Sequence, residues 1–172
     1  MKKTMTLLLF ATAIALTGCD WIKGLGEVDF STDLTVNIPV TVSSGNKATL
    51  NYTASSELKL ADNEDVEPYL NKLRKIDLKS VVITITGLIP EQTINTLSLD
   101  VAGVGTLFTQ NNITSTNNSF TPAVDAAKLN QAGEKLKNEK KITLTASGTA
   151  SGPMAFNAGV LFDATITAGA LD

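Results

Sequence analysis

The sequence predicts a mainly β protein, an antiparallel β-sandwich with immunoglobulin-like layering and two short peripheral helices. Long stretches of the chain alternate apolar and polar residues with a period of two, as a strand does when one face is buried. The expected order of elements, β-β-α-β-β-(β)-α-β-β, lacks the sustained βαβ alternation that builds a parallel sheet.

The first expected strand covers residues 28–42, where apolar residues fall on even positions. Such a strand would span roughly 50 Å, well beyond the usual length. We therefore expect a bend or bulge, and Pro39 indicates a point where the ladder is interrupted or lies at an edge. A turn at 43–46 and renewed alternation over 48–60 then predict a long hairpin.

A first helix is expected after this hairpin. The acidic run 62–65 precedes apolar residues spaced on one helical face, and Lys72, Arg74 and Lys75 suit the C-terminal end of a helix. Because Pro68 is tolerated only in the first turn, the cap is expected near Asp65.

Three strands and a second helix follow. The strands are expected over 78–86, with burial on both faces, over 94–101 and, as a short one, over 105–109. A polar loop covers 110–119. Thr121-Pro122 then provides an N-cap followed by a proline in the first helical position, which predicts a surface helix with a thin apolar stripe.

The C-terminal part repeats the opening pattern. Residues 142–150 and 154–166 alternate on either side of Gly152-Pro153, which predicts a second long hairpin. Many of its inner residues are small, and this leaves an alternative fold open. In that alternative, a curved sheet wraps on a helix, as in tubular lipid-binding proteins, and encloses space instead of filling it.

The N-terminus has the three zones of a signal peptide. Lys2 and Lys3 form a basic region, residues 7–16 form an uncharged apolar stretch, and small residues precede Cys19. The apolar stretch is about half the roughly 20 residues that a membrane-spanning helix needs. We expect a signal peptide over 1–18, a lipid anchor and tether over 19–26, and a single β domain over 27–172.

Leu16-Thr17-Gly18-Cys19 resembles the lipobox of bacterial lipoproteins, in which Leu, a small or polar residue and Gly or Ala precede the cysteine. The resemblance covers these four residues and none of the folded domain. It implies a diacylglyceryl group on the Cys19 sulfur, cleavage just before Cys19 and often a third acyl chain on the new amine. Asp20 is compatible with retention at the inner membrane in some lineages and with the outer membrane in others, and we expect the outer membrane.

The cysteine count agrees with an anchor. Cys19 is the only cysteine, so an intramolecular disulfide is impossible and its thiol needs another role. Two or more acyl chains give stable attachment where one chain is marginal. Trp21, the only tryptophan, suits the headgroup layer, or it folds back onto the domain.

Charge and composition exclude several function classes. The formal charge of −3 argues against nucleic acid, which requires a basic face. The absence of histidine removes Ser-His-Asp and Cys-His nucleophile systems and every His-ligated metal site. Aromatic residues make up 5% of the chain, which leaves a paired-carboxylate glycosidase without the usual sugar platform. We predict no enzyme, no catalytic residue, no cofactor and no metal.

Three local patterns have simpler structural explanations. Ser44 and Lys47 match the Ser-x-x-Lys pattern but lie in a turn rather than on a helix. The acidic run 62–65 offers oxygen ligands for calcium, yet the N-terminus of a helix explains it without a metal. The lysine cluster at 135–141 could touch anionic headgroups, but charge compensation at the helix end and solvation are the favoured explanation.

The sequence supports two functions. The first is a membrane-anchored lipoprotein whose non-catalytic β domain binds an envelope protein or a glycan, or has a structural role, in the cell envelope. The alternative is a carrier of a lipid or another hydrophobic ligand. Small inner residues would line its cavity: Ala146, Gly148, Ala150, Ala158 and Ala164.

Overall fold

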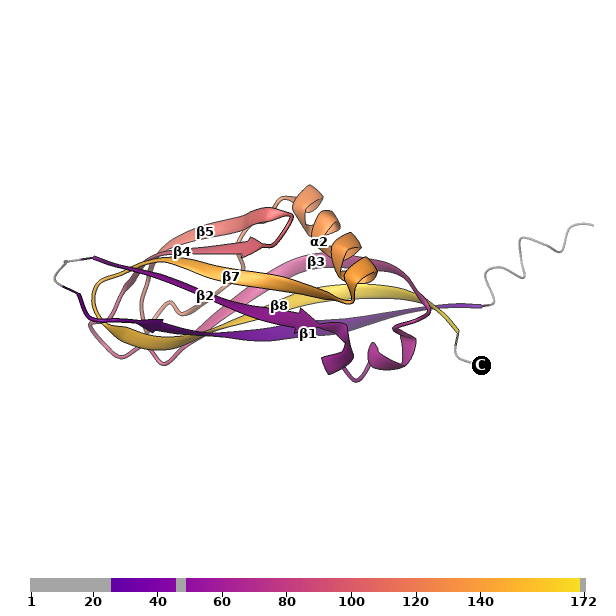
Figure 1. Cartoon of the computed structure of the whole chain (residues 1–172), viewed down its shortest axis with the longest axis horizontal. Coiled ribbons are helices and arrows are strands. Elements are labelled where there is room, and N and C mark those ends of the chain that lie inside the picture. The colour runs from indigo at the N-terminus through magenta and orange to yellow at the C-terminus, as the bar shows by residue number, and fades with distance from the viewer. Residues whose placement is uncertain (1–25, 46–48, 171–172) are drawn as a thin grey trace, which may run out of the picture.

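The computed structural model describes residues 26–45 and 49–170, which form a β-sandwich of two four-stranded sheets. Sheet A has the order β1-β8-β3-β6 and sheet B the order β2-β7-β4-β5, and every pairing is antiparallel. The predicted antiparallel sandwich is therefore confirmed (Figure 1). Its elements are β1 (Glu27–Val42), β2 (Leu50–Lys59), the 3₁₀ helices η1 (Leu60–Asp62) and η2 (Glu67–Tyr69), β3 (Leu73–Thr86), β4 (Ile94–Val101), β5 (Gly105–Ile113), β6 (Ser119–Phe120), α2 (Ala126–Glu139), β7 (Lys141–Ala150) and β8 (Met154–Gly169).

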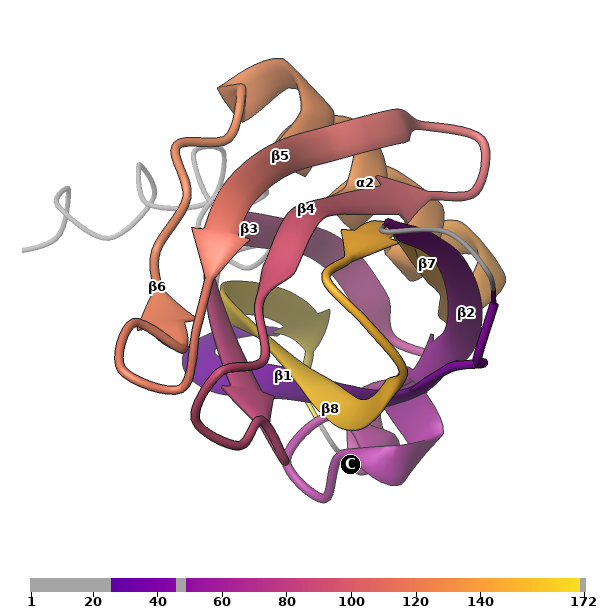
Figure 2. The same ribbon diagram turned by 90° about the vertical axis from the view of Figure 1, so that its left-hand side faces the viewer.

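The strand pairing is that of a jelly roll. β1 pairs with β8, β2 with β7, β3 with β6 and β4 with β5, so partners are nested from the ends of the chain inward. The layering agrees with the prediction, whereas the connections are not those of an immunoglobulin domain. Viewed from one end, the two sheets curve around a common interior (Figure 2).

Both predicted hairpins are wrong. β1 and β2 lie in different sheets, as do β7 and β8, so each predicted hairpin is an arch that crosses from one sheet to the other. The two arches pair with each other, β1 with β8 in sheet A and β2 with β7 in sheet B. The ladder of sheet A ends at Val42↔Met154 and that of sheet B begins at Leu50↔Ala150, so residues 43–49 separate β1 from β2 and residues 151–153 separate β7 from β8.

β1 is an edge strand and keeps one register with β8 along its 16 residues, so this pairing contains no bulge. Asn63 Nδ2 and Ser56 Oγ donate hydrogen bonds to the carbonyls of Asp33 and Asn37, 3.0 and 2.8 Å away. Odd-numbered residues of β1 therefore direct their backbone groups away from β8. Pro39 shares this parity, so its missing N–H falls on the free edge and removes no ladder bond.

The first predicted helix is wrong. Residues 60–72 form η1, η2 and turns that cross from sheet B to sheet A, and β3 already begins at Leu73. Arg74 and Lys75, expected at a helix end, lie in β3, which gains hydrogen bonds to β8 from Leu73↔Ala168 onward. A long neighbouring strand thus overrides the local helical pattern.

The boundaries of the remaining elements differ more modestly. β4 matches its predicted range, whereas β5 continues to Ile113, through part of the predicted polar loop. The second helix begins at Ala126 rather than at Pro122, because Asp125 is its N-cap and accepts a hydrogen bond from the Ala127 amide at 2.7 Å. Val82 in β3 is half-buried while its neighbours Val81 and Ile83 are fully buried.

α2 packs against β3 and β7 and so covers one open side of the sandwich (Figure 1). Leu129, Ala132 and Leu136 are buried in this contact. Gly133 faces the backbone of β3, and a Cβ at this position would lie 2.4 Å from the Ile76 carbonyl oxygen. The thin apolar stripe predicted for the helix is therefore the face on which it docks.

Inward-facing residues of both sheets form one apolar core. Tyr52 of β2 and Phe156 of β8 meet edge to face across it, with ring centroids 5.5 Å apart, and the Tyr52 hydroxyl donates to the Thr96 carbonyl at 2.8 Å. A Cβ on Gly148 would lie 1.8 Å from that carbonyl oxygen and 2.9 Å from the Tyr52 hydroxyl. At Gly148 the small residue makes room for neighbouring protein atoms, so it does not contribute to a cavity.

We expect Gly133→Ala to lower the free energy of unfolding by about 1–2 kcal/mol. Overpacking costs about 1–3 kcal/mol, while the better helix propensity of Ala returns at most about 1 kcal/mol. Chemical denaturation measures the difference. Gly152→Ala is the matched control, because nothing lies within 4 Å of a Cβ there. A Gly133→Ala variant more stable than wild type would show that α2 does not approach β3 this closely.

Tyr52→Phe is expected to lower the free energy of unfolding by about 1–3 kcal/mol, because the partly buried Thr96 carbonyl loses its donor while the ring contact remains. Burial raises the pKa of Tyr52 above its ordinary value. The unfolded chain therefore ionises first, and the wild type loses stability as the pH rises through about 10. The stability difference between wild type and Tyr52→Phe should shrink over the same range, and a difference independent of pH would contradict this.

Candidate functional site

The predicted lipidation site, Cys19, lies outside the described residues, as does Trp21. The structure describes the chain from Gly26, whose carbonyl accepts a hydrogen bond from the Ala170 amide at 2.7 Å. The two ends of the described chain thus meet at one pole of the sandwich, here called the anchor pole (Figure 1). The opposite distal pole carries the connections around 43–45, 87–93, 114–118 and 151–153.

The acidic run 62–65 at the anchor pole organises a turn. Asn63 Oδ1 accepts hydrogen bonds from the amides of Asp65 and Val66, both at 3.1 Å. Asp65 Oδ2 accepts from Thr32 Oγ1 at 2.9 Å, which holds the 60–72 segment against β1. Within 26–45 and 49–170, no three Asp, Glu, His or Cys side chains are grouped so that they would hold a metal ion.

The lysine cluster at the end of α2 is engaged within the protein. Lys135 pairs with Glu139 at 2.6 Å and Lys137 with Glu134 at 2.5 Å. Lys140 Nζ donates to the Lys137 carbonyl at 2.6 Å, and Lys141 pairs across strands with a glutamate of β2. These contacts agree with charge compensation at the helix end. Among the described residues, no helix has the length and apolar character needed to cross a bilayer.

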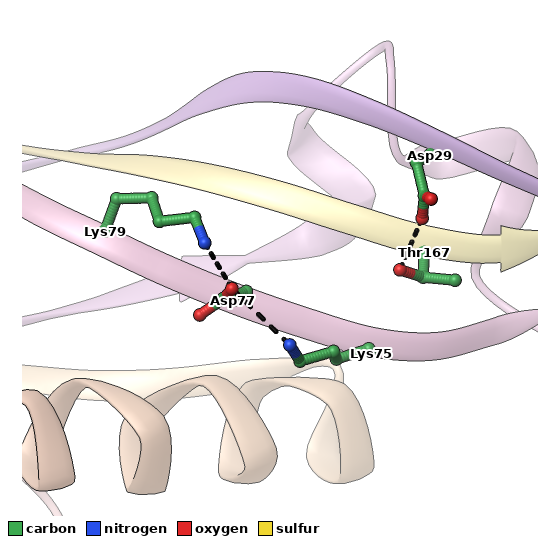
Figure 3. Close-up of polar contacts among 5 residues, drawn as sticks. All are labelled: Asp29, Lys75, Asp77, Lys79 and Thr167. Carbon is green, nitrogen blue, oxygen red and sulfur yellow. Dashed lines mark hydrogen bonds and ion pairs between the residues drawn. The ribbon is translucent and has the colours of Figure 1, made fainter.

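The outer face of sheet A carries charges. Asp77 of β3 lies between Lys75, 3.4 Å away, and Lys79, and Thr167 of β8 donates to Asp29 of β1 at 2.6 Å (Figure 3). The hydrogen bond from Lys79, together with the charge of Lys75, lowers the pKa of Asp77 below its ordinary value. In these two places the polar groups of the face satisfy one another.

The outer face of sheet B is different. Three rows of outward-facing residues cross all four of its strands in register, and we call these twelve residues the hydroxyl grid. Each of them is Ser, Thr, Asn or Asp, and none is buried. The rows, from β2 through β7 and β4 to β5, are Asn51-Thr149-Thr96-Asn111, Thr53-Ser147-Ser98-Thr109 and Ser55-Thr145-Asp100-Thr106.

Hydrogen bonds between neighbouring strands order the hydroxyl grid. Ser55 Oγ and Thr145 Oγ1 lie 2.8 Å apart, and Ser98 Oγ and Thr109 Oγ1 lie 2.9 Å apart. Thr106 Oγ1 donates to Asp100 at 2.6 Å, and Asp100 is the one charged member. At the end of this face toward the anchor pole, Glu57 contacts Lys141 and Lys59 at 2.7 and 3.6 Å, and at the edge of the grid Lys128 Nζ donates to the Thr106 carbonyl.

Sequence reasoning did not identify the hydroxyl grid. The signal was present, because Ser, Thr and Asn occupy every second position of 51–55, 145–149 and 96–100 apart from Asp100. The strand partners were wrong, however, since β2 was paired with β1 and β7 with β8. With those partners the polar positions could not be combined into one surface.

The distal pole bears an exposed apolar side chain, Ile89, which is 60% exposed. Its loop is ordered by Gln92, whose side chain accepts from the Ile89 amide at 3.2 Å. Thr93 and Ser151 exchange two hydrogen bonds, which fix this loop to the connection between β7 and β8. A single exposed apolar residue is common on protein surfaces and does not by itself define a site.

No protein-family model matches the chain, and no curated protein matches it. Among solved structures, the chain is similar to one titled Desmodium yellow mottle tymovirus, with 11% identity, a TM-score of 0.35 and coverage of 83% of this chain and 90% of that one. It is also similar to one titled turnip yellow mosaic virus, with 11% identity, a TM-score of 0.36 and coverage of 99% and 93%.

Proposed function

We propose that the chain is a lipoprotein anchored through Cys19, and that its β domain binds a ligand or partner in the cell envelope without catalysing a reaction. The lipobox-like sequence before Cys19 supports the anchor. The position of Gly26 at one pole carries the proposal, because a tether from Cys19 would hold that pole toward the bilayer. We place the protein at the outer membrane in preference to the inner one.

The shape of the domain suits display from a membrane. β1 has 16 residues, which corresponds to roughly 50 Å of extended strand. A domain held at the anchor pole would present its distal loops and its sheet faces to the surroundings. Loops and faces positioned by a rigid scaffold are common sites of recognition.

A carrier function finds less support. The prediction depended on small inner residues that enclose space, and at Gly148 that space is occupied by the Thr96 carbonyl and the Tyr52 hydroxyl. Native mass spectrometry of the protein from its host tests this alternative directly. Co-purifying lipid would favour a carrier over the binding domain proposed here.

Metabolic labelling with a clickable palmitate tests the anchor. The wild type should incorporate the label and sediment with membranes, whereas Cys19→Ser should lose the label and leave the membrane fraction, because its sulfur is the expected acyl acceptor. Density-gradient separation of the membranes then distinguishes outer from inner. Cys19→Ser combined with Ser151→Cys is the matched control, which restores a thiol at the distal pole and should remain unlabelled. An unlabelled wild type, or a labelled Cys19→Ser, would contradict the proposal.

A further inference from the structure

We propose that the hydroxyl grid on the outer face of sheet B binds a neutral polysaccharide. This inference deepens the proposed function, on which it rests for the location of the domain in the envelope. It names the binding surface and the chemical class of the ligand. The geometry and composition of the twelve grid residues carry it.

The charge of the grid selects a neutral ligand. Eleven of its twelve side chains are uncharged, and the remaining one is the carboxylate of Asp100. An anionic polymer or an anionic headgroup requires Lys or Arg, and the grid has neither. Lys128 of α2 reaches the edge of the grid, where its Nζ donates a hydrogen bond to the Thr106 carbonyl, and Lys59 and Lys141 lie beside Glu57 at the end of this face. A ligand without formal charge is therefore the one that the nearly uncharged grid favours.

The size and composition of the grid disfavour a protein partner. With strands about 4.8 Å apart and residues about 3.3 Å apart along them, the grid measures roughly 14 by 13 Å. This area is far below the approximately 800 Å² that a stable protein interface buries on each partner. Ser and Thr, which make up most of the grid, are also under-represented among the main energetic contributors to protein interfaces.

The functional groups of the grid match those of a sugar. Each hydroxyl both donates and accepts a hydrogen bond, and the amides of Asn51 and Asn111 at two corners of the grid do the same. Short side chains lose little rotamer freedom on binding, and the Ser55–Thr145 and Ser98–Thr109 contacts already order part of the surface. Repeated rows offer equivalent contacts to repeated units, so a polymer gains from multivalency where a single sugar does not.

The test uses the full chain purified in detergent and insoluble cellulose, mannan, starch and β-1,3-glucan as probes, with alginate as an acidic polymer. The wild type should be retained on at least one neutral polymer, to the same extent at low and high salt, because no ion pair contributes. Ser147→Lys places a long cation at the centre of the grid and should reduce retention at least about tenfold. Thr53→Lys, in the same row, should reduce retention in the same way. Agreement between the two variants would show that misfolding of Ser147→Lys does not cause the loss.

Thr35→Lys is the matched control, because it adds the same charge to an exposed position of β1 on the outer face of sheet A. It should bind as the wild type does. Retention on no neutral polymer, retention on alginate alone, or equal retention of all three variants would overturn the proposal. Palmitate labelling reports on the anchor independently, so failure of the grid and failure of the proposed function are distinguishable.

Discussion

The fold depends on the pairing of the first two strands with the last two. β1 pairs with β8 and β2 with β7, so the first two and last two strands form one antiparallel ribbon that folds over at the arches. These contacts join residues far apart in sequence. Forming them costs loop-closure entropy, which the burial of apolar side chains in the core offsets. β3 pairs with β8, β4 pairs with β7, and α2 packs on β3 and β7, so the other elements contact the strands of this ribbon.

This ribbon also decides which side chains share a surface. Folding it at the arches turns its apolar positions inward in both sheets and leaves two different outer faces. Sheet A presents charged groups such as Asp77 and Lys79, which satisfy one another. Sheet B gathers the hydroxyl grid from four strands that are scattered along the chain. One connectivity therefore produces the core and the candidate binding surface together.

Close approaches between backbones fix how the parts meet. At Gly148 the absence of a side chain lets the backbone of β7 lie close to the Thr96 carbonyl and the Tyr52 hydroxyl. At Gly133 it lets α2 lie against the Ile76 carbonyl of β3. Gly148 looks like a place where a strand leaves space, and Gly133 looks like a weak point in a helix. In the structure the Tyr52 hydroxyl and the Thr96 carbonyl occupy the space at Gly148. Gly133 lies where α2 packs against β3, so both glycines permit a close contact.

The sequence by itself determined the fold class and, in the strands that alternate strictly, the face on which a residue lies, because period-two alternation reports burial within a strand. It also placed β4 at its observed bounds. Only the tertiary structure decided which strands are neighbours, that Arg74 and Lys75 belong to a strand, and that polar positions of β2, β7, β4 and β5 form one grid. The physical reason is that alternation gives the direction of a side chain, whereas strand partners depend on long-range packing that no local pattern encodes.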